Sequence, residues 1–434
     1  MQSIWSNTAT TPDFPQLQGD KTTDVLIIGG GMAGLLCAHS LHQAGVPYLL
    51  VESNKIGSGV TKNTTAKITA QHGLIYHDLL QKAGAQKAKL YLNANQHAVR
   101  QYKRLCADID CNFEEKDAFV YSLNNREIIE QELSALQKIG FPATFEPKLP
   151  LPFPVAGAVR FPRQAQFHPL KFIAQLSKNL HIYEHTPVKT LAPYTAVTDH
   201  GKIKAKHIIV ATHFPFLNKH GAYFLKLYQH RSYAIALEHA PNLSGMYVDE
   251  KQNGLSFRNF GGLLIIGGGD HRTGQQGGNW KQLRNFATNA YPGVREKYAW
   301  ATQDCMSLDN IPYIGRYGKS ARGLYVATGF NKWGMTGSMV AANLLTDLIL
   351  ERKNPCASVF SPGRSILKPQ LLVNGLTAVG NLLTPSPKRC PHMGCALKWN
   401  KAEQSWDCPC HGSRFDKSGA LLIGPATGSL ENQK

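Results

Sequence analysis

Hydrophobic and polar positions near the start of the chain fall into blocks that predict a strand, a helix and a second strand. Residues 25–28 form an apolar run typical of a buried parallel strand. A glycine-rich turn follows, and then a helix-like segment from Met32 to Ala44 that ends at Gly45. A second apolar run at 48–51 leads into Glu52. This order predicts a β-α-β unit in a parallel sheet covered by helices.

Helix-like and strand-like patterns recur farther along the chain in separate blocks. Residues 79–139 hold two long helical patterns, and residues 226–290 hold strand-like runs. The run at 207–212 has the pattern of a strand that returns to the first sheet. In the stretch 370–383, apolar residues recur at helical spacing, namely Leu372, Leu376, Val379 and Leu383.

The turn after the first strand matches the pattern G-x-G-x-x-G at residues 29–34. Glycines there allow a tight turn and let a pyrophosphate approach the helix N-terminus, whose free N–H groups favour anions. Glu52 follows at about the twenty-residue spacing where an acidic residue accepts hydrogen bonds from ribose hydroxyls. Taken alone, the motif fits NAD, FAD or a simple glycine-rich turn.

Four potential metal ligands near the C-terminus occur in the patterns C-x-H and C-x-x-H: Cys390, His392, Cys408 and His411. Two thiolates and two imidazoles on separate loops suit a [2Fe-2S] cluster with cysteines on one iron and histidines on the other. Structural zinc is the alternative, because it uses the same ligand types. Both loops carry an extra cysteine, which favours the cluster.

The segment 390–426 resembles the Rieske domains of respiratory cytochrome complexes, and Gly-Pro-Ala at 424–426 is similar to their proline loop. The resemblance implies that the two cysteines of the paired motifs hold one iron and the two histidines the other. It also implies a disulfide between Cys395 and Cys410 that ties the loops together, and a hydrogen bond from the Ser413 hydroxyl to a bridging sulfide.

Two features depart from those relatives. Phe415 stands where they commonly carry a tyrosine, and a phenyl ring cannot donate a hydrogen bond toward a ligand sulfur. Fewer donors to sulfur predict a lower reduction potential. The relatives also have strands before the first ligand loop, whereas a helical pattern at 370–383 precedes it here. The cluster module is therefore predicted to be abridged and to rely on the rest of the protein.

A second glycine-rich strand-to-helix transition lies at 323–337 and follows the sequence DNIPYIG at 309–315. Together with the first β-α-β unit, it resembles the D-amino-acid oxidase-like flavoproteins, the superfamily of glycine oxidase and sarcosine oxidase. The resemblance covers about residues 20–352 and implies bound FAD. The FAD-binding residues expected from it are Gly29, Gly31, Met32, Ala33, Gly34, Glu52, Ser53, Thr61, Thr65, Ala66, Lys67, Val188, Gly329, Gly334, Met335 and Thr336.

These resemblances predict an α/β fold with a Rossmann-like FAD-binding domain, an α+β substrate domain and a small all-β Rieske module. A proline-rich linker joins the module to the rest. The expected ranges are about 20–90, 150–215 and 305–352 for FAD binding, 91–149 and 216–304 for the substrate domain, 353–369 for the linker and 370–434 for the module.

Four residues are candidates for contact with a substrate. Arg231 and Arg258 lie in predicted substrate-domain strands, where an arginine can bind a carboxylate through two parallel hydrogen bonds. A structural role is the more common one for an arginine. His72 and Lys332 lie near the flavin by alignment to the family motifs. A structural hydrogen bond fits His72 as well as acid–base catalysis does.

Composition and charge limit the classes of partner that the protein can bind. The net charge of +18 suits an acidic electron-carrier protein, an anionic substrate or a membrane surface, and dispersed Lys and Arg also fit a solvated cationic surface. No nucleic-acid-binding module is recognisable. Neither a signal sequence at 1–24 nor an apolar run of about 18 residues is present. We therefore expect a cytoplasmic protein without a transmembrane segment.

The two cofactors predict an enzyme that oxidises a C–H bond beside nitrogen in a small amine or amino-acid-like substrate. FAD takes two electrons and a Rieske cluster carries one, so electrons are expected to leave singly to an external acceptor. The amine assignment rests on family resemblance. Two other functions stay open: a reductase in which electrons run from cluster to FAD to substrate, and a redox sensor without metabolite turnover.

Overall fold

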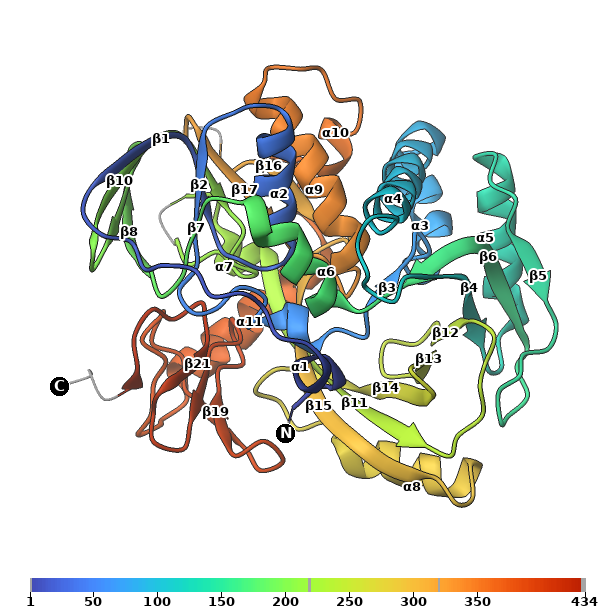
Figure 1. Cartoon of the computed structure of the whole chain (residues 1–434). Helices are drawn as coiled ribbons and strands as arrows, with labels where there is room; N and C mark the ends of the chain where they lie inside the picture. Colours follow the sequence, from blue (N-terminus) through green and yellow to red (C-terminus); the bar gives the residue numbers. More distant parts are fainter. Residues whose placement is uncertain (1, 218–219, 319–320, 431–434) are drawn as a thin grey trace.

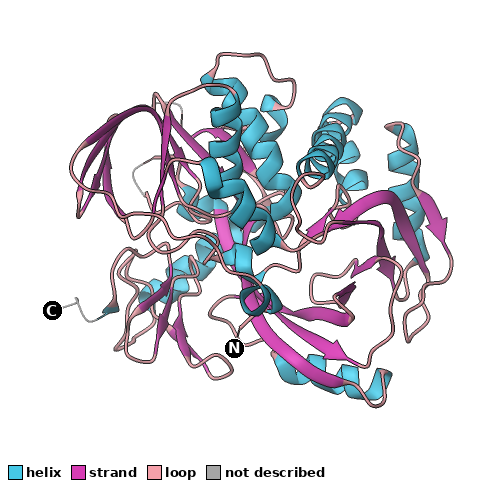
Figure 2. Ribbon diagram, in the orientation of Figure 1, coloured by secondary structure: helices cyan, strands magenta, loops and turns pink. Residues whose placement is uncertain are grey.

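The computed structural model describes residues 2–217, 220–318 and 321–430, which form three β-sheets with helices packed around them (Figures 1 and 2). The first sheet and the small C-terminal sheet lie on one side of the view in Figure 1, and the second large sheet lies on the other. The expected mixed α/β architecture with a small C-terminal β-sheet module is confirmed.

The first sheet has the strand order β16-β17-β10-β1-β2-β7, in which all strands except β16 run parallel. The predicted first unit is present, since α2 (Met32–Gln43) connects β1 (Lys21–Ile28) to β2 (Tyr48–Val51). β1 is apolar and buried over its last four residues because the sheet is covered on both faces. The remaining strands are β7 (Ile182–Tyr183), β8 (Val188–Ala192), β9 (Thr195–Thr198), β10 (Gly201–Val210), β16 (Tyr313–Arg316) and β17 (Leu324–Thr328).

The second sheet has the order β15-β11-β14-β13-β12-β4-β6-β3, with β5 paired to β6. Most of its pairs are antiparallel, and β12 with β4 is parallel. Its strands are β3 (Lys67–Ile68), β4 (Glu114–Ser122), β5 (Thr144–Glu146), β6 (Gly157–Gln166), β11 (Leu227–Glu238), β12 (Met246–Asp249), β13 (Ser256–Phe260), β14 (Leu263–Arg272) and β15 (Arg295–Ser307).

Helices cover both sheets. In Figure 1, α9 (Gly334–Ile349) lies against α2 beside the first sheet. The two predicted helical patterns near residue 100 are α4 and α5, whose apolar positions face the core at helical spacing. The other helices are α1 (Ile4–Thr8), α3 (Ile75–Ala83), α4 (Ala85–Leu105), α5 (Arg126–Lys138), α6 (Pro169–Leu176), α7 (Tyr223–Lys226), α8 (Trp280–Ala290) and α10 (Ala357–Phe360).

The C-terminal module consists of α11 (Pro369–Leu383) followed by the antiparallel sheet β18-β19-β20-β21. The helical pattern before the first ligand loop is therefore a helix, as predicted. Upstream, Val359 and Phe360 of α10 are buried in the main core, so part of the proline-rich linker is packed against the FAD-binding part. The four strands are β18 (Lys398–Asn400), β19 (Ser405–Asp407), β20 (Arg414–Asp416) and β21 (Leu421–Ile423).

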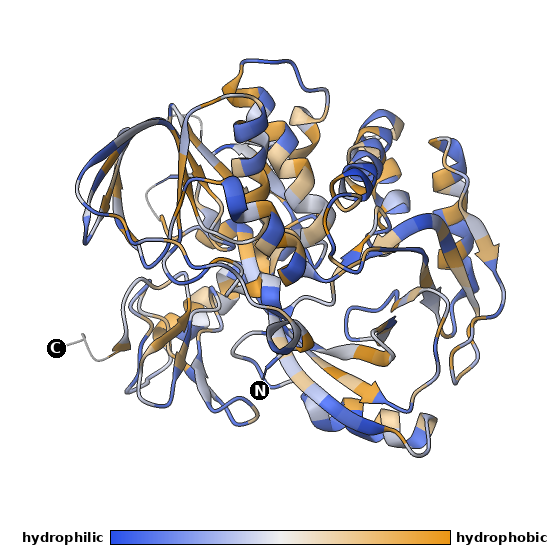
Figure 3. Ribbon diagram, viewed as in Figure 1, coloured by the Kyte–Doolittle hydropathy of each residue, from blue (hydrophilic) through white to orange (hydrophobic). Residues whose placement is uncertain are grey.

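Hydrophobic colour in Figure 3 concentrates in the strands of the sheets and in the helices packed on them. Charged and polar residues colour the outer loops and the exposed side of α4. None of the helices in the described ranges combines the length and the apolar character that crossing a bilayer requires.

Gly34 allows α2 to start immediately beside β1. A Cβ atom built at Gly34 would lie 1.8 Å from the Gly29 carbonyl oxygen, which is too close for any side chain. We predict that Gly34→Ala lowers the free energy of unfolding by about 1–3 kcal/mol and reduces FAD content, because the turn must open. Thermal unfolding and the FAD-to-protein absorbance ratio measure both effects.

The matched control is Gly375→Ala in α11, where a Cβ atom meets nothing within 4 Å. That change adds a good helix former at a helical position and should leave both the melting temperature and the FAD content at least as high. Equal melting temperatures for the Gly34 variant and the unchanged protein would contradict the prediction.

Candidate functional site

A cavity of about 1360 Å³ runs between the two large sheets and reaches the C-terminal module. Segments far apart in sequence line it, including the first glycine-rich turn, the start of α9 and the loop after β21. Of the residues expected to bind FAD, those that line it are Gly29, Gly31, Met32, Ala33, Glu52, Ser53, Thr61, Thr65, Lys67, Val188, Gly334 and Met335. The other four expected residues do not line the cavity: Gly34, Ala66, Gly329 and Thr336.

The glycine-rich turn presents the N-terminus of α2 to the cavity. Gly31 is the N-cap residue and has no side chain with which to cap the helix. The Met32 N–H donates to Thr61 Oγ1 over 3.1 Å, which joins the turn to the hydroxyl-rich loop. Gly29 has φ +111°, and a Cβ atom there would lie 2.6 Å from the Ala211 carbonyl oxygen. The turn therefore has the close backbone approach and the open helix end that a pyrophosphate needs.

Glu52 is held at the carboxyl end of β2. Its Oε2 accepts a hydrogen bond of 2.7 Å from the Gly30 N–H, and its Oε1 accepts one of 2.9 Å from the Asn54 N–H. These bonds orient the carboxylate toward the cavity that it lines. Together with the turn, this position fits the ribose side of a dinucleotide.

His72 lies in the loop before α3, lines the cavity and contacts the first turn of α9. Its Nδ1 is 2.6 Å from the Tyr91 hydroxyl, and its Nε2 is 2.8 Å from the Thr69 carbonyl oxygen and 2.9 Å from Thr336 Oγ1. The ring also stacks on Trp333 with 5.0 Å between centroids. Burial lowers the pKa of His72 to about 3, so the ring is neutral at ordinary pH. These contacts favour a positioning role for His72.

A polar cluster lies at the end of the cavity formed by β11, β14 and β15. Lys332 Nζ is 2.7 Å from Asp270 Oδ2, and His230 Nδ1 is 3.1 Å from the same oxygen. The Ser232 hydroxyl donates to Asp270 Oδ1 over 3.3 Å and lies 3.5 Å from Asp304 Oδ2. Burial raises the pKa of Asp304 to about 6. Burial opposes ionisation of Asp270 as well, but His230 and Lys332 outweigh it and lower the pKa of that carboxyl.

The two arginine candidates point away from the cavity. Arg231 forms a bidentate ion pair with Glu403, a residue of the C-terminal module, and its Nε–Oε1 distance is 3.0 Å. Arg258 is fully buried and donates through Nη1 to the carbonyl oxygens of Thr65 and Ala66, at 2.7 and 2.8 Å. In this structure Arg231 holds the module, and Arg258 holds the hydroxyl-rich loop.

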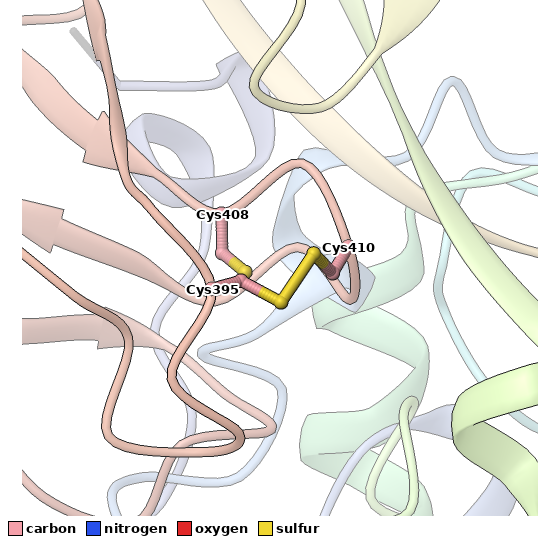
Figure 4. A group of neighbouring side chains, drawn as sticks. All are labelled: Cys395, Cys408 and Cys410. Atoms are coloured by element: carbon pink, nitrogen blue, oxygen red, sulfur yellow. A yellow bond between two sulfur atoms is a disulfide. The ribbon is translucent and has the colours of Figure 1, made fainter. Parts of the chain in front are cut away.

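The expected disulfide between Cys395 and Cys410 is present and joins the two ligand loops (Figure 4). Cys408 Sγ lies near this disulfide. A hydrogen bond with the Cys408 thiol, helped by Ser413 and by backbone N–H groups, lowers the pKa of Cys390 to about 7. Two thiols outside the disulfide therefore remain as ligands, one on each loop. The thiolate is favoured at Cys390, whereas the shared hydrogen bond and burial raise the pKa of Cys408.

The two candidate histidine ligands face each other. His392 Nδ1 and His411 Nδ1 are 3.2 Å apart, so both imidazoles direct the same ring atom to one point. Ser413 Oγ accepts a hydrogen bond of 3.0 Å from the Ala426 N–H, which joins the second loop to the proline loop. Two cysteines and two histidines thus converge as the [2Fe-2S] ligand set requires.

The tip of these loops faces the cavity. The carbonyl oxygen of Phe224 accepts from His411 Nε2 over 3.1 Å. The Phe214 ring lines the cavity and lies edge-on to both imidazoles, with centroid distances of 6.3 Å to His392 and 5.8 Å to His411. Residues 424–426 of the proline loop line the same cavity. One aromatic ring therefore touches the FAD-side cavity and both candidate cluster histidines.

Sequence reasoning missed several of these residues. Phe214 and Phe224 lie in the segment between β10 and β11, which carries no motif. Asp270 and Asp304 lie 34 positions apart in two different strands, and only strand pairing brings them together. Their one sequence signal was a carboxylate within a strand that also carries apolar residues.

Asp304 makes stability depend on pH. The folded pKa of about 6 lies above the ordinary aspartate value, so the folded state binds the proton more tightly. Its stabilising contribution is complete below about pH 4 and is lost as the pH rises to about 6. We predict that Asp304→Asn gains about 3 kcal/mol relative to the unchanged protein between pH 4 and pH 8. Urea unfolding at the two pH values measures this difference.

The exposed Asp199 provides a control, because Asp199→Asn removes a carboxylate that is 55% exposed and pairs with Lys189 at the surface. The difference between this variant and the unchanged protein should stay small at both pH values. A pH-independent effect of Asp304→Asn would show that burial does not perturb this carboxyl.

Comparison with known proteins identifies two families along the chain. Residues 24–348 match the family described as DAO, FAD dependent oxidoreductase, and residues 380–434 match the Rieske [2Fe-2S] domain. The "Putative Rieske 2Fe-2S iron-sulfur protein YhfW" of Bacillus subtilis (strain 168) is 34% identical, over 99% of this chain and 97% of that protein. The cytochrome b6-f complex iron-sulfur subunit 1 of Nostoc is 51% identical over 41 residues, which are 9% of this chain and 23% of that protein.

Solved structures share the fold. Glycine oxidase from Geobacillus kaustophilus has a TM-score of 0.67 and 20% identity, and covers 80% of this chain and 100% of its own. L-proline dehydrogenase from P. horikoshii has a TM-score of 0.65 and 18% identity, and covers 79% of this chain and 97% of its own. The chain therefore belongs to the DAO family of FAD-dependent oxidoreductases and carries a C-terminal Rieske [2Fe-2S] domain.

Proposed function

We propose that this FAD-dependent oxidoreductase is a dehydrogenase of a small amine or amino-acid-like compound, with its own Rieske domain as the electron outlet to an external acceptor. When bound, FAD accepts a hydride from the substrate, and the [2Fe-2S] cluster carries electrons one at a time. The observation that carries this proposal is the contact of both candidate cluster histidines with Phe214, whose ring lines the FAD-side cavity.

The polar end of the cavity supports an amino-acid-like substrate. Asp270 and Asp304 provide carboxylates that attract an ammonium group, and Lys332 provides a cation that attracts a carboxylate. Both signs of charge therefore face one space, as a zwitterion requires. Structural neighbours named for glycine and L-proline share the fold, which agrees with this substrate class.

The arrangement of the loops supports an internal electron route. The Gln229 side chain donates to the His411 carbonyl oxygen over 2.6 Å, and the Gln303 side chain donates to the Gly412 carbonyl oxygen over 2.7 Å. Both glutamines belong to strands that also form the cavity wall. The second ligand loop is thus bound to the same strands that carry the polar cluster.

Anaerobic mixing with glycine, L-proline or a related amine tests the proposal. We predict that the flavin absorbance bleaches first and that a Rieske-type EPR signal then appears in the same sample. The rate of the second step should not change with protein concentration, because both cofactors belong to one chain. Rapid peroxide release that outpaces artificial acceptors in air would contradict the dehydrogenase assignment.

Glu403→Gln tests the route through the docked module. The change leaves Arg231 and Arg414 without their shared carboxylate partner, and loss of one member of a buried ion pair costs about 3–5 kcal/mol. Flavin bleaching should persist while reduction of the cluster slows and becomes dependent on protein concentration. The control is Glu127→Gln on α5, which replaces an exposed carboxylate with the same carboxamide. An unchanged cluster step in Glu403→Gln would refute the internal route.

Phe415 provides a second readout that is independent of turnover. Its ring is fully buried in the same small core as Cys390 and Cys408. Phe415→Tyr adds a hydroxyl that can donate a hydrogen bond toward a ligand sulfur, so we predict a higher reduction potential. An EPR-monitored redox titration measures it. The change Leu422→Thr on β21, at a side chain that is 52% exposed, should leave the potential unchanged. Equal potentials for all three proteins would contradict the prediction.

A further inference from the structure

Helix α11 is oriented in the opposite way from a helix on an ordinary water-exposed surface. Its polar Asn374 is buried at 4% exposure, whereas Leu372, Leu376 and Leu383 are 72%, 76% and 77% exposed. A surface helix normally turns its apolar side to the core and its polar side to water. In α11 the apolar side faces outward.

Buried hydrogen bonds hold α11 in this orientation. Asn374 Oδ1 accepts a bond of 3.1 Å from Arg272 Nη1, and Asn374 Nδ2 donates to the Leu225 carbonyl oxygen over 3.2 Å. Arg272 also donates to the carbonyl oxygen of Pro409 in the second ligand loop. Rotation that hides the leucines would leave these buried groups without partners. The outward apolar side is therefore part of the fold.

The outward residues form one continuous surface, which we call the α11 face. Positions 372, 376, 379 and 383 repeat at helical spacing on one side of the helix. Leu367, just before the helix, adds a side chain that is 83% exposed. Helix α11 carries no charged residue and lies beside the strands of the C-terminal module in Figure 1. The α11 face consists of Leu367, Leu372, Leu376, Val379 and Leu383.

The chain segment that contains the α11 face carries charged side chains of a single sign, and one of them, Arg364, is paired with Asp309 outside the segment. From Arg352 to Ala402 the chain contains eight Lys or Arg residues and no Asp or Glu. These cations flank the helix in sequence on both sides, with Lys368 immediately before it and Lys388 shortly after it. An apolar helix side bordered by basic residues suits an interface between hydrocarbon and anionic headgroups.

We propose that the α11 face binds the surface of an anionic membrane, with the helix lying in the plane of that surface. Its 15 residues are fewer than the roughly 20 that a spanning helix needs, so the helix lies on the bilayer. Two copies of the chain would bring two all-basic segments together, whereas anionic lipids neutralise them. Membrane binding is independent of the substrate and of the electron route.

Sedimentation with lipid vesicles tests this proposal on the full-length holoprotein. We expect binding to vesicles of phosphatidylcholine with phosphatidylglycerol, much weaker binding to phosphatidylcholine alone, and weaker binding to the anionic vesicles at high salt. The triple variant Leu372→Gln, Leu376→Gln, Leu383→Gln should reduce the partition constant by about tenfold or more.

The control variant is Leu123→Gln, which changes a leucine that is 45% exposed outside α11 and should bind vesicles as the unchanged protein does. FAD content and the melting temperature show that both variants are folded. No binding of the unchanged protein to anionic vesicles would overturn the proposal, as would equal binding by the triple variant. If the unchanged protein does not bind vesicles but forms a dimer, and the triple variant is monomeric, the α11 face binds a second copy of the chain instead.

Discussion

The ion pair between Arg231 and Glu403 is the contact on which the relation between the two parts of the protein depends. It is buried, bidentate and shared with Arg414 of the module, so three charges are removed from water together. Such a group is stable only while every member is paired, because an unpaired buried charge costs several kcal/mol. The pairing therefore imposes one orientation of the Rieske module on the strands β11 and β15.

Several features follow from that orientation. The second ligand loop meets Gln229 and Gln303, which bind its backbone carbonyls, and His411 reaches the Phe224 carbonyl. The same interface places Arg272 against Asn374, which turns the apolar side of α11 outward. One docking geometry thus sets the path between cavity and cluster loops as well as the exposed surface of the helix.

The substrate-contact candidates illustrate how burial changes the role of a residue. Arg231 and Arg258 were placed in the correct sheet, but one binds the module and the other binds two backbone carbonyls. His72 has its ring nitrogens engaged and its pKa lowered by burial. Of the four candidates, Lys332 is the one that presents a charged group to the cavity. Its partner Asp270 comes from a strand without any motif. A residue type suggests chemistry, and its packing partners decide whether that chemistry is available.

The sequence by itself determined the two cofactor modules, because their signals are local. The glycines of the first turn, Glu52 and the paired C-x-H and C-x-x-H loops act over a few bonds or one β-α-β unit. In the structure, Glu52 and most of these glycines line the cavity, and the histidines of the two loops face each other. Only the tertiary structure decided how the modules meet. The Arg231–Glu403 pair, the Asp270–Asp304 cluster and the outward side of α11 join segments tens to hundreds of residues apart. Such contacts depend on which surfaces become buried together, and no local spacing records that.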